Sequence, residues 1–383
     1  MSPVGFSPGK SDNKRGDMAA ESGNPNESAA SACSLRVVAM GGGTGLSTLL
    51  KGLKRYVKPP GEAAAAAGAA AIGELNAVVT VTDDGGSSGR LRREFNILPP
   101  GDIRNCIVAL SEDETLLSRL FQYRFPSGEG LEGHNLGNLF VAALTAVTGD
   151  FAEAVKLSSE VLATRGHIYP ATTANVVLEA LMADGSRVQG ETRITASPGR
   201  IADLRMVPAD PQPLPQALDA IAHADLITIG PGSLFTSLIP NMLVRGVPEA
   251  VARSQAAKVF ICNLMTEANE SLGLSAADHI KAIYRHTAGH RIFDYALVNR
   301  TPASEALKKK YALEGAAQIV NDLDEIEKLG VRPLEGDYLD ETTEVARHAT
   351  DRVARDLLAL AGDRVPSGSK PSPTPRPHVK IAH

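Results

Sequence analysis

A short apolar run that ends in a glycine-rich turn and leads into an amphipathic helix most constrains the fold of this 383-residue chain. The run is Leu35–Met40, the turn is Gly41–Gly45, and leucines recur at helical spacing from Leu46 to Leu53. A second apolar run, Leu75–Thr82, is rich in β-branched residues and stops at a pair of aspartates. Strand, glycine turn, helix and strand in this order begin a parallel α/β sheet.

The same pattern returns in the second half of the chain, where three apolar runs end in small or amide residues. They are Asp225–Ile229, Lys258–Cys262 and Tyr295–Val298. The runs are continuously apolar rather than alternating, which indicates strands covered by helices on both faces. The sequence therefore predicts a Rossmann-like, doubly wound, mainly parallel sheet. Ligands of such folds bind at the carboxyl ends of the strands.

Apolar spacing predicts helices between these two halves and again beyond residue 300. A small β-hairpin is expected with strands Val176–Leu181 and Arg187–Ile194 around the turn Asp184–Gly185, attached to the edge of the main sheet or covering a helix. The expected helices are Asp102–Leu110, Thr115–Phe125, Leu136–Val147, Phe151–Leu162, Ala303–Tyr311, Asp322–Leu329 and Ala346–Leu360.

Composition separates one α/β domain, residues 35–362, from three segments of low complexity. Residues 1–34 are rich in Ser, Gly, Asn and Pro and are predicted to be a disordered tail, because they cannot bury enough apolar area to offset ordering. Residues 59–73 form an Ala-rich insert, either a flexible loop or a frayed helical turn. Residues 363–383 are predicted to be a disordered, basic, Pro-rich tail.

Charge and composition exclude several classes of protein. The net charge is −5, which argues against a nucleic-acid partner held by a broad basic surface. The three cysteines are far apart and form no C-x-x-C pair, so neither a disulfide framework nor a cysteine zinc site is expected. No apolar run approaches the roughly 18 residues of a membrane span. With no signal-like apolar stretch near the N-terminus, a cytoplasmic protein is expected.

Two junctions of strand, glycine turn and helix, Gly41–Gly45 and Gly230–Ser233, are candidate phosphate sites. Glycines let backbone N–H groups approach an anion, and a helix N-terminus adds partial positive charge. Two junctions at one cleft suit a diphosphate, although tight turns that need glycine only for geometry are the alternative. Neither junction matches the dinucleotide fingerprint or the P-loop, which disfavours an NAD-dependent dehydrogenase.

A polar stretch, Asp83–Ser88, follows the second expected strand. Its paired carboxylates could hold a metal, bind ribose hydroxyls or act as a base, and its small residues offer N–H and hydroxyl donors. A divalent metal is not favoured, because Asp83 and Asp84 are adjacent and no third ligand stands at a useful spacing.

Several polar residues stand at the starts of expected helices. Asp102 is expected to cap the helix that it begins. Asn105 lies in the first turn of that helix, and both a ligand contact and a purely structural role are left open for it. His134 is either a helix cap or a general base. Asn135 and Asn138 are three residues apart and share a helix face, which fits a polar ligand better than a metal.

Taken together, these motifs resemble the gluconeogenesis factor family of the 2-phospho-L-lactate transferase-like superfamily. The resemblance covers about residues 35–350. It is carried by the segments MGGGTGLSTLLKGLK, VTVTDDGGSSGRLRREF, LPPGDIRN, LFQYRF, GHNLGNLFVAALT, ADLITIGPGSLFTSLIPNMLV, CNLMTEANES and AADHIKA.

The resemblance implies a Rossmann-like cytoplasmic bacterial factor that binds UDP-sugars such as UDP-N-acetylglucosamine and supports normal cell shape during gluconeogenic growth. No reaction and no required cofactor are implied. Position by position, Tyr311 after its lysine run and Arg347 correspond to family residues implicated in nucleotide-sugar binding. The chain departs from the family pattern at Phe235, where Tyr is usual, and at Ala349, where Asp usually follows the Arg-His pair.

The resulting hypothesis is a non-catalytic UDP-sugar-binding regulator with a protein partner in cell-wall or carbon metabolism. A homo-oligomer is compatible with the sequence. The alternative is a transferase similar to 2-phospho-L-lactate transferase, although the end of the second strand favours the regulator. The candidate ligand-binding residues are Gly41, Gly42, Gly43, Thr44, Gly45, Asp83, Asp84, Gly85, Gly86, Ser87, Ser88, Asn105, His134, Asn135, Asn138, Gly230, Pro231, Gly232, Ser233, Asn263, Tyr311 and Arg347.

Overall fold

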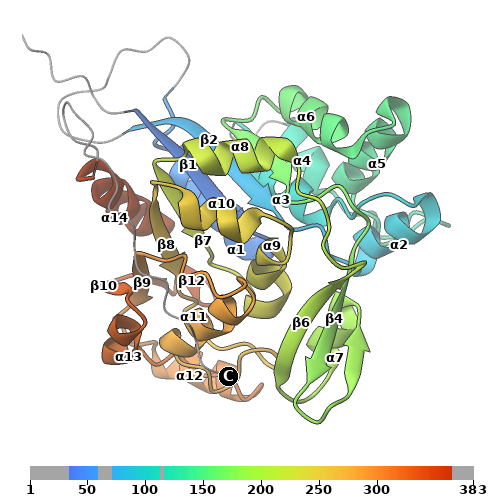
Figure 1. The fold of residues 1–383 in the computed structure, drawn as a ribbon. Coiled ribbons are helices and arrows are strands. Elements are labelled where there is room, and N and C mark those ends of the chain that lie inside the picture. The colour runs from blue at the N-terminus through green and yellow to red at the C-terminus, as the bar shows by residue number, and fades with distance from the viewer. Residues whose placement is uncertain (1–33, 59–70, 113–115, 365–383) are drawn as a thin grey trace, which may run out of the picture. The chain divides into compact units, whose positions relative to one another are not determined.

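The computed structural model describes residues 34–58, 71–112 and 116–364, which belong to one compact unit (Figure 1). Nearly all of the two predicted tails and most of the Ala-rich insert lie outside the described residues. The last three residues of that insert, 71–73, correct the prediction, because they form the start of strand β2 (Ala71–Val79).

Seven parallel strands form the main sheet in the order β10-β9-β8-β7-β1-β2-β3, which confirms the predicted fold class. The five predicted strands are present, and the short edge strands β3 and β10 were not predicted. The remaining bounds are β1 (Ser34–Gly41), β3 (His167–Pro170), β7 (Leu226–Ile229), β8 (Ala257–Ile261), β9 (Tyr295–Asn299) and β10 (Arg332–Gly336).

The direction in which the sheet grows reverses between β1 and β7. From β1 the chain adds β2 and β3 on one side, and after returning to β7 it adds β8, β9 and β10 on the other. Connections that diverge from two adjacent parallel strands leave a crevice at their carboxyl ends, where open α/β sheets bind ligands. The glycine junctions follow these two strands.

Alternate side chains of the strands enter two apolar cores, one on each face of the sheet. Val38 and Met40 enter one core, whereas Val37 and Ala39 enter the other. Figure 1 shows the helices of the first core in front of the sheet. That face is covered by α8 (Pro215–His223), α9 (Ile239–Met242), α10 (Val247–Arg253), α11 (Ala276–Arg285) and α13 (Leu323–Lys328). The other is covered by α1 (Gly43–Lys54), α3 (Gly101–Leu110) and α14 (Thr350–Gly362).

The helices predicted between the two halves of the sheet are present, with shifted ends. Helix α4 stops at Gln122, so the predicted extension to Phe125 is wrong; Arg124 instead forms an isolated bridge with Asn135. The bounds are α4 (Leu116–Gln122), α5 (Leu136–Thr148) and α6 (Phe151–Val161), with α12 (Glu305–Ala312) later in the chain. Helix α2 (Gly86–Phe95) was not predicted.

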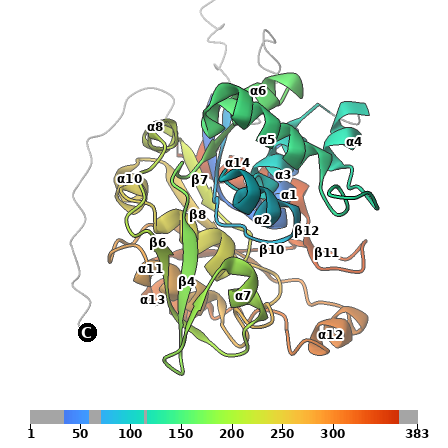
Figure 2. The ribbon, with the colours of Figure 1, turned by 90° about the vertical axis from the view of Figure 1, so that its right-hand side faces the viewer.

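The predicted hairpin is part of a separate three-stranded antiparallel sheet, β5-β4-β6, and does not join the main sheet (Figure 2). Strands β4 (Val177–Met182) and β5 (Arg187–Gln189) pair as expected. The second strand ends five residues early because the chain turns at Gly190, whose φ is 98°, into helix α7 (Glu191–Ala196). Strand β6 (Ile201–Val207) supplies an unpredicted third strand.

A second correction concerns the start of the last helix. Residues 346–349 are not helical, because Arg347 and His348 form strand β12, which pairs antiparallel with β11 (Leu339–Asp340). Helix α14 begins only at Thr350. This pairing holds Arg347 in an extended segment beside the crevice.

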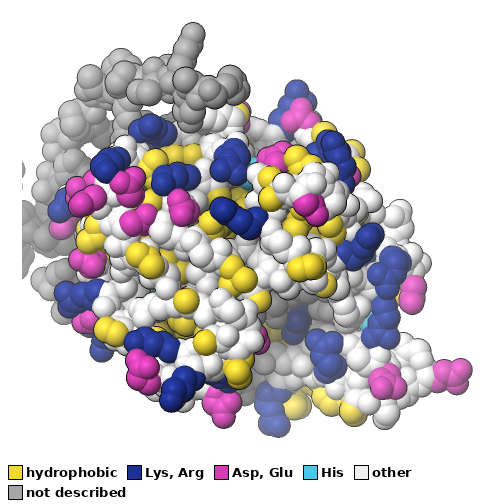
Figure 3. All heavy atoms as spheres, turned by 90° about the horizontal axis from the view of Figure 1, so that it is seen from below, with side chains coloured by type: hydrophobic (Ala, Val, Ile, Leu, Met, Phe, Trp, Pro, Cys, Tyr) yellow, Lys and Arg dark blue, Asp and Glu magenta, His cyan; other side chains and the backbone are white. Residues whose placement is uncertain are grey.

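Charged side chains of both signs are interspersed over the face seen from below (Figure 3), in keeping with the net charge of −5. Within the part of the chain that the structure describes, no helix is both long and apolar enough to cross a membrane.

Candidate functional site

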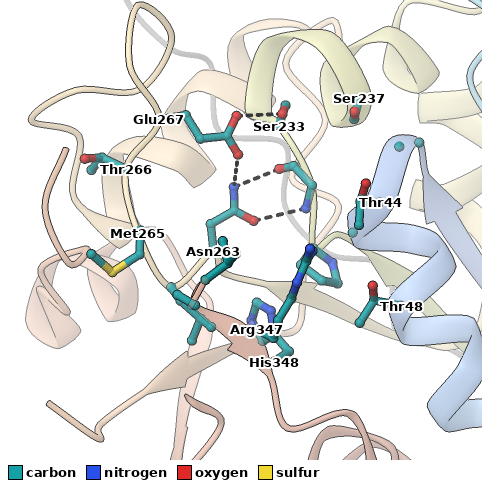
Figure 4. Close-up of a pocket in the computed structure, with 18 of the residues that line it drawn as sticks. Thr44, Thr48, Ser233, Ser237, Asn263, Met265, Thr266, Glu267, Arg347 and His348 are labelled. Carbon is teal, nitrogen blue, oxygen red and sulfur yellow. Dashed lines mark hydrogen bonds between the residues drawn. The ribbon is translucent and has the colours of Figure 1, made fainter. Parts of the chain in front are cut away.

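A cavity of about 300 Å³ opens at the carboxyl ends of β1 and β7 (Figure 4). The first glycine loop with the start of α1, the second glycine loop, the segment after β8, and the α12–β12 wall surround it. The lining residues are Gly42, Gly43, Thr44, Gly45, Thr48, Pro231, Gly232, Ser233, Ser237, Asn263, Leu264, Met265, Thr266, Glu267, Tyr311, Val345, Ala346, Arg347 and His348.

The structure brings ten of the predicted site residues to this cavity, and twelve lie elsewhere. The ten are Gly42, Gly43, Thr44, Gly45, Pro231, Gly232, Ser233, Asn263, Tyr311 and Arg347. Those outside the lining are Gly41, Asp83, Asp84, Gly85, Gly86, Ser87, Ser88, Asn105, His134, Asn135, Asn138 and Gly230.

The N-terminus of α1 borders the cavity. Its N-cap is Gly42, which has no side chain to accept hydrogen bonds from the first turn. Thr44 is exposed, and Gly45 and Thr48 also line the cavity. The first N–H groups of a helix have no partner within the helix and carry partial positive charge. This end of α1 can therefore receive a phosphate.

Asp102 contacts the first glycine loop and does not cap its own helix, contrary to the prediction. The N-cap of α3 is Pro100, and the Asp102 carboxylate accepts a hydrogen bond from the Gly43 N–H. Desolvation, followed by the nearby charge of Asp83, raises the pKa of Asp102 to about 6. One N–H of the loop is thus already bound to an acid of the protein.

The second glycine loop differs from the open N-terminus that was predicted. It leads into a π-helical turn, Leu234–Leu238. Side chains of the segment after β8 accept hydrogen bonds from the backbone N–H groups of this loop and turn. Glu270 accepts from the N–H groups of Phe235 and Thr236 at 2.6 and 3.0 Å. Its pKa is raised to about 8, first by desolvation and then by the charge of Glu267. An internal carboxyl group therefore stands where an external anion was expected.

Asn263 and Glu267 complete the internal bonding of this loop. The Asn263 amide accepts from the Gly232 N–H at 3.0 Å and donates to the Gly232 carbonyl at 2.8 Å, while the Ser233 hydroxyl donates to Glu267 at 2.6 Å (Figure 4). The loop is rigidly placed by these bonds. At the start of α1 Asp102 binds one N–H group, that of Gly43, whereas Glu270 binds two at the start of the π-helical turn.

The third wall of the cavity joins α12 to strand β12. The Ala346 N–H donates to the Tyr311 hydroxyl at 3.2 Å. The His348 Nε2 lies 3.1 Å from the Cys262 carbonyl oxygen and therefore donates to it. Desolvation lowers the pKa of His348 to about 4, so this histidine is neutral at pH 7. Arg347 is exposed, and it is the cationic side chain that lines the cavity.

The polar stretch after β2 bonds mainly within the protein. Asp83 accepts from the Gly85 N–H at 2.8 Å, and Asp84 accepts from the N–H and hydroxyl of Thr192 at 2.8 and 2.6 Å. The Ser87 hydroxyl lies 3.1 Å from the Nδ1 of His134. These contacts tie the start of α2 to α7 and to the loop before α5.

The amides predicted to meet a ligand also have partners inside the protein. Asn135 caps α5 by accepting from the Asn138 N–H, which leaves no capping role for His134. The side-chain amide oxygen of Asn138 accepts a hydrogen bond from the Arg104 Nε at 3.2 Å. Asn105 is half-buried on α3 and does not line the cavity.

Glu191, at the start of α7, was not predicted, and it belongs to a carboxyl-rich region with Asp83, Asp84 and Asp102. The Thr82 hydroxyl lies 3.5 Å from its Oε2. Desolvation raises the pKa of Glu191 to about 9, with further contributions from Asp102 and Asp83. Among the described residues, no group of three or more His, Cys, Asp or Glu side chains is placed to hold a metal ion.

The raised pKa of Glu191 predicts a pH-dependent stability. An unfolded Glu ionises near pH 4.5 and the folded one near 9, so between these values the folded protein holds a proton that the unfolded chain has lost. The free energy of unfolding contributed by Glu191 therefore falls as the pH rises from about 4.5 to 9. Gln cannot ionise, so the stability of Glu191→Gln relative to the original should rise between pH 5 and pH 9, by up to about 5 kcal/mol.

Urea unfolding at both pH values measures this difference. Glu160→Gln, at an exposed position of α6, is the matched control and should leave the pH dependence unchanged. An equal difference between the Glu191→Gln variant and the original at pH 5 and pH 9 would contradict the assignment.

Thr48, Ser237, Thr266 and Glu267 line the cavity without having been predicted, and so does His348, the second residue of the Arg-His pair that the family resemblance pointed to. The end of β8 was a signal that could have indicated Glu267, because Asn263 was predicted there as a site residue and Glu267 lies four residues later. Glu270 offered no local pattern, since it binds a segment that is remote in sequence.

Comparison with known proteins identifies the family. Residues 37–339 match the family described as 2-phospho-L-lactate transferase CofD. The chain belongs to the CofD family. Members with related sequences are named gluconeogenesis factor: those of Bacillus subtilis and Halalkalibacterium halodurans are each 45% identical. The match covers 85% of this chain and 98% of the former, and 84% of this chain and 95% of the latter.

The CofD-family fold is also seen in a crystal structure. A Bacillus halodurans protein, described as a member of the UPF0052 family, superposes with TM-scores of 0.79 and 0.78 in two structures at 45% identity. The match covers 85% of this chain and 99% of that one.

Proposed function

We propose that this chain binds a UDP-sugar, of the UDP-N-acetylglucosamine type, in the cavity at the carboxyl ends of β1 and β7. In this proposal it is a cytoplasmic, non-catalytic regulator that supports normal cell shape during gluconeogenic growth. The observation that carries the proposal is one cavity bordered both by the N-terminus of α1, whose N-cap Gly42 has no side chain, and by the cation of Arg347.

A diphosphate requires two sources of positive potential, and this cavity offers them from different elements. The first turn of α1 suits one phosphate. Because Glu270 and Asn263 occupy N–H groups of the second loop, the other phosphate falls to Arg347, whose guanidinium can form charge-assisted hydrogen bonds. The hydroxyl groups of Thr48 and Ser237, which also line the cavity, suit the sugar.

The wall formed by α12 and β12 suits a regulator. Besides the Tyr311–Ala346 bond, Lys310 donates to the backbone carbonyl of Glu344 at 2.8 Å, so α12 moves together with the segment that leads to Arg347. A ligand that binds Arg347 would therefore shift this wall. In the proposal, a protein partner in cell-wall or carbon metabolism contacts the outer side of the wall.

A transferase similar to 2-phospho-L-lactate transferase is the second candidate, and two observations favour it. The family match spans residues 37–339. Asp102 binds the Gly43 N–H of the first glycine loop, and the nearby charge of Asp102 helps to raise the pKa of Glu191; with pKa values of about 6 and 9, these two acids could exchange protons near neutral pH.

Thermal unfolding with added ligand tests the binding, and analysis of the nucleotide tests catalysis. UDP-N-acetylglucosamine at 100 times its dissociation constant should stabilise the fold by about 2.7 kcal/mol. UDP and GDP-mannose serve as matched controls for the sugar and the base.

Chromatography after long incubation with Mg²⁺ should recover the UDP-sugar intact. Turnover of the UDP-sugar, or of a deazaflavin with an activated phospholactate, would favour the transferase, and no stabilisation by any UDP-sugar would contradict the binding proposal.

A further inference from the structure

A second cavity, of about 150 Å³, lies between helix α11 and the start of strand β6. One face of α11 forms a wall of it, with Asp278, Lys281, Ala282 and Arg285 at spacings of three and four. Among the described residues, its lining shares none with the first cavity. Its volume is half that of the first cavity, so it admits a small molecule rather than a nucleotide.

Three cationic residues line this second cavity, and two of them have no acidic partner. Lys281 pairs with Asp278 at 3.2 Å. The Arg285 Nη1 donates to the backbone carbonyl of Ala202 at 2.9 Å, which leaves further N–H groups of its guanidinium for other acceptors. Within the part of the chain that the structure describes, neither Arg200 nor Arg285 forms an ion pair with a carboxylate. Both arginines are exposed at the cavity, where they can bind an anion from solution.

The floor of the second cavity is buried and mainly apolar. Ile201, Phe235 and Ala282 line it and are 7, 3 and 5% exposed. Glu270 is the buried acid of the lining, and its Oε1 already accepts from two backbone N–H groups. Because its pKa is raised to about 8, mainly by desolvation, this carboxyl group is mostly protonated at pH 7 and adds little negative charge. The cavity therefore offers cations beside an apolar surface.

We propose that the second cavity binds a short-chain phosphate monoester, with its phosphate held by Arg200 and Arg285 and its carbon chain on the apolar floor. Three cations and the carboxylate of Asp278 leave a net charge of +2, which a phosphate dianion balances. Guanidinium groups bind phosphate oxygens through pairs of N–H bonds, and a monoester has three terminal oxygens to share between both arginines and Lys281. A dicarboxylate carries the same charge on two separate groups and fits a single cluster of cations less well.

Calorimetric titration of the full chain with propyl phosphate tests the proposal. One molecule should bind per chain, and Arg200→Ala and Arg285→Ala should each weaken binding by at least about 10-fold, because charge-assisted hydrogen bonds are lost. Both positions are exposed, so folding should persist, as circular dichroism can verify. Arg200→Lys keeps the charge without the planar fork and should have an intermediate affinity. Arg253→Ala removes an exposed arginine from the last turn of α10, outside the cavity, and is the matched control for Arg285→Ala.

Comparison of ligands and of sites completes the test. Inorganic phosphate and succinate should both bind more weakly than propyl phosphate, because only the ester joins a phosphate to a chain that covers the apolar floor. Arg347→Ala should leave the affinity for propyl phosphate unchanged, since Arg347 lines the first cavity alone, and this result does not depend on UDP-sugar binding. The proposal would be overturned by no binding at millimolar propyl phosphate, by equal or tighter binding of phosphate or succinate, or by unchanged affinity of the Arg200→Ala and Arg285→Ala variants. Loss of binding in Arg347→Ala would place the anion in the first cavity and would overturn it as well.

Discussion

Replacing Gly45 by Val should abolish UDP-sugar binding, because a side chain at this position would force the two glycine loops apart. A Cβ atom on Gly45 would stand 2.9 Å from the Gly232 Cα and 2.7 Å from the Pro231 carbonyl carbon, and it would overlap the Pro231 carbonyl oxygen. These are backbone atoms that Asn263 holds in place, so they cannot rotate away. We expect an affinity loss of at least about 100-fold and a stability loss of about 1–3 kcal/mol.

Gly52 on the same helix provides a matched control for this substitution. A Cβ atom there would lie 2.8 Å from the Thr350 carbonyl oxygen, so Gly52→Val should also cost stability. Its side chain points to the start of α14, away from the cavity lining. Thermal unfolding gives the stability of both variants, and calorimetric titration gives their affinity. Equal binding by the folded Gly45→Val variant would contradict the proposed placement of the phosphate.

Much of the sheet was predictable because its central strands carry their own signal. Buried parallel strands are predominantly apolar and β-branched, as in Val37–Met40 and Leu226–Ile229, and these two each stop at glycine. The edge strands lack that signal. His167–Pro170 has two residues that are not fully buried and contains proline, and Arg332–Gly336 contains an exposed arginine and glutamate. Their position depends on the neighbouring strand rather than on local pattern.

The cavity was predictable only where strand ends determine it. Parallel strands bring their carboxyl ends to one edge, so the first loop, the second loop and Asn263 were expected to meet. The same reasoning placed Asp83–Ser88 in the cavity, but residues 80–84 extend beyond β2 and carry this stretch toward α7. Strand ends therefore indicate an edge of the sheet, not a set of contacts.

Glu270 shows what motif reading cannot detect. Gly230–Ser233 has the composition of an anion site, and the prediction assumed that its anion would be a ligand. In the fold a carboxyl group 34 and 35 residues farther along the chain binds these N–H groups instead. A glycine junction predicts donors, whereas the partner of the donors is a property of the tertiary structure.

The last prediction concerns Arg347, on which the proposal places the second phosphate. Arg347→Ala should weaken UDP-sugar binding by roughly 1.5–3 kcal/mol, or about 10- to 150-fold, because a charge-assisted pair is lost. Stability should hardly change, since Arg347 is exposed and the strand pairing of β12 uses only its backbone. Arg355→Ala removes the same charge from an exposed position of α14 and is the matched control.

The cellular result then separates ligand sensing from the presence of the protein. If the regulator acts through its ligand, cells that carry only the Arg347→Ala variant should lose normal shape on gluconeogenic carbon, whereas cells with Arg355→Ala should keep it. Unchanged affinity of Arg347→Ala would remove Arg347 from the site. Lost affinity with normal cell shape would instead show that the shape function does not depend on the ligand. The substitution leaves Tyr311 and Lys310 unchanged, and these residues join α12 to the segment that leads to β12. Arg347→Ala therefore removes the cation from the cavity without breaking these bonds.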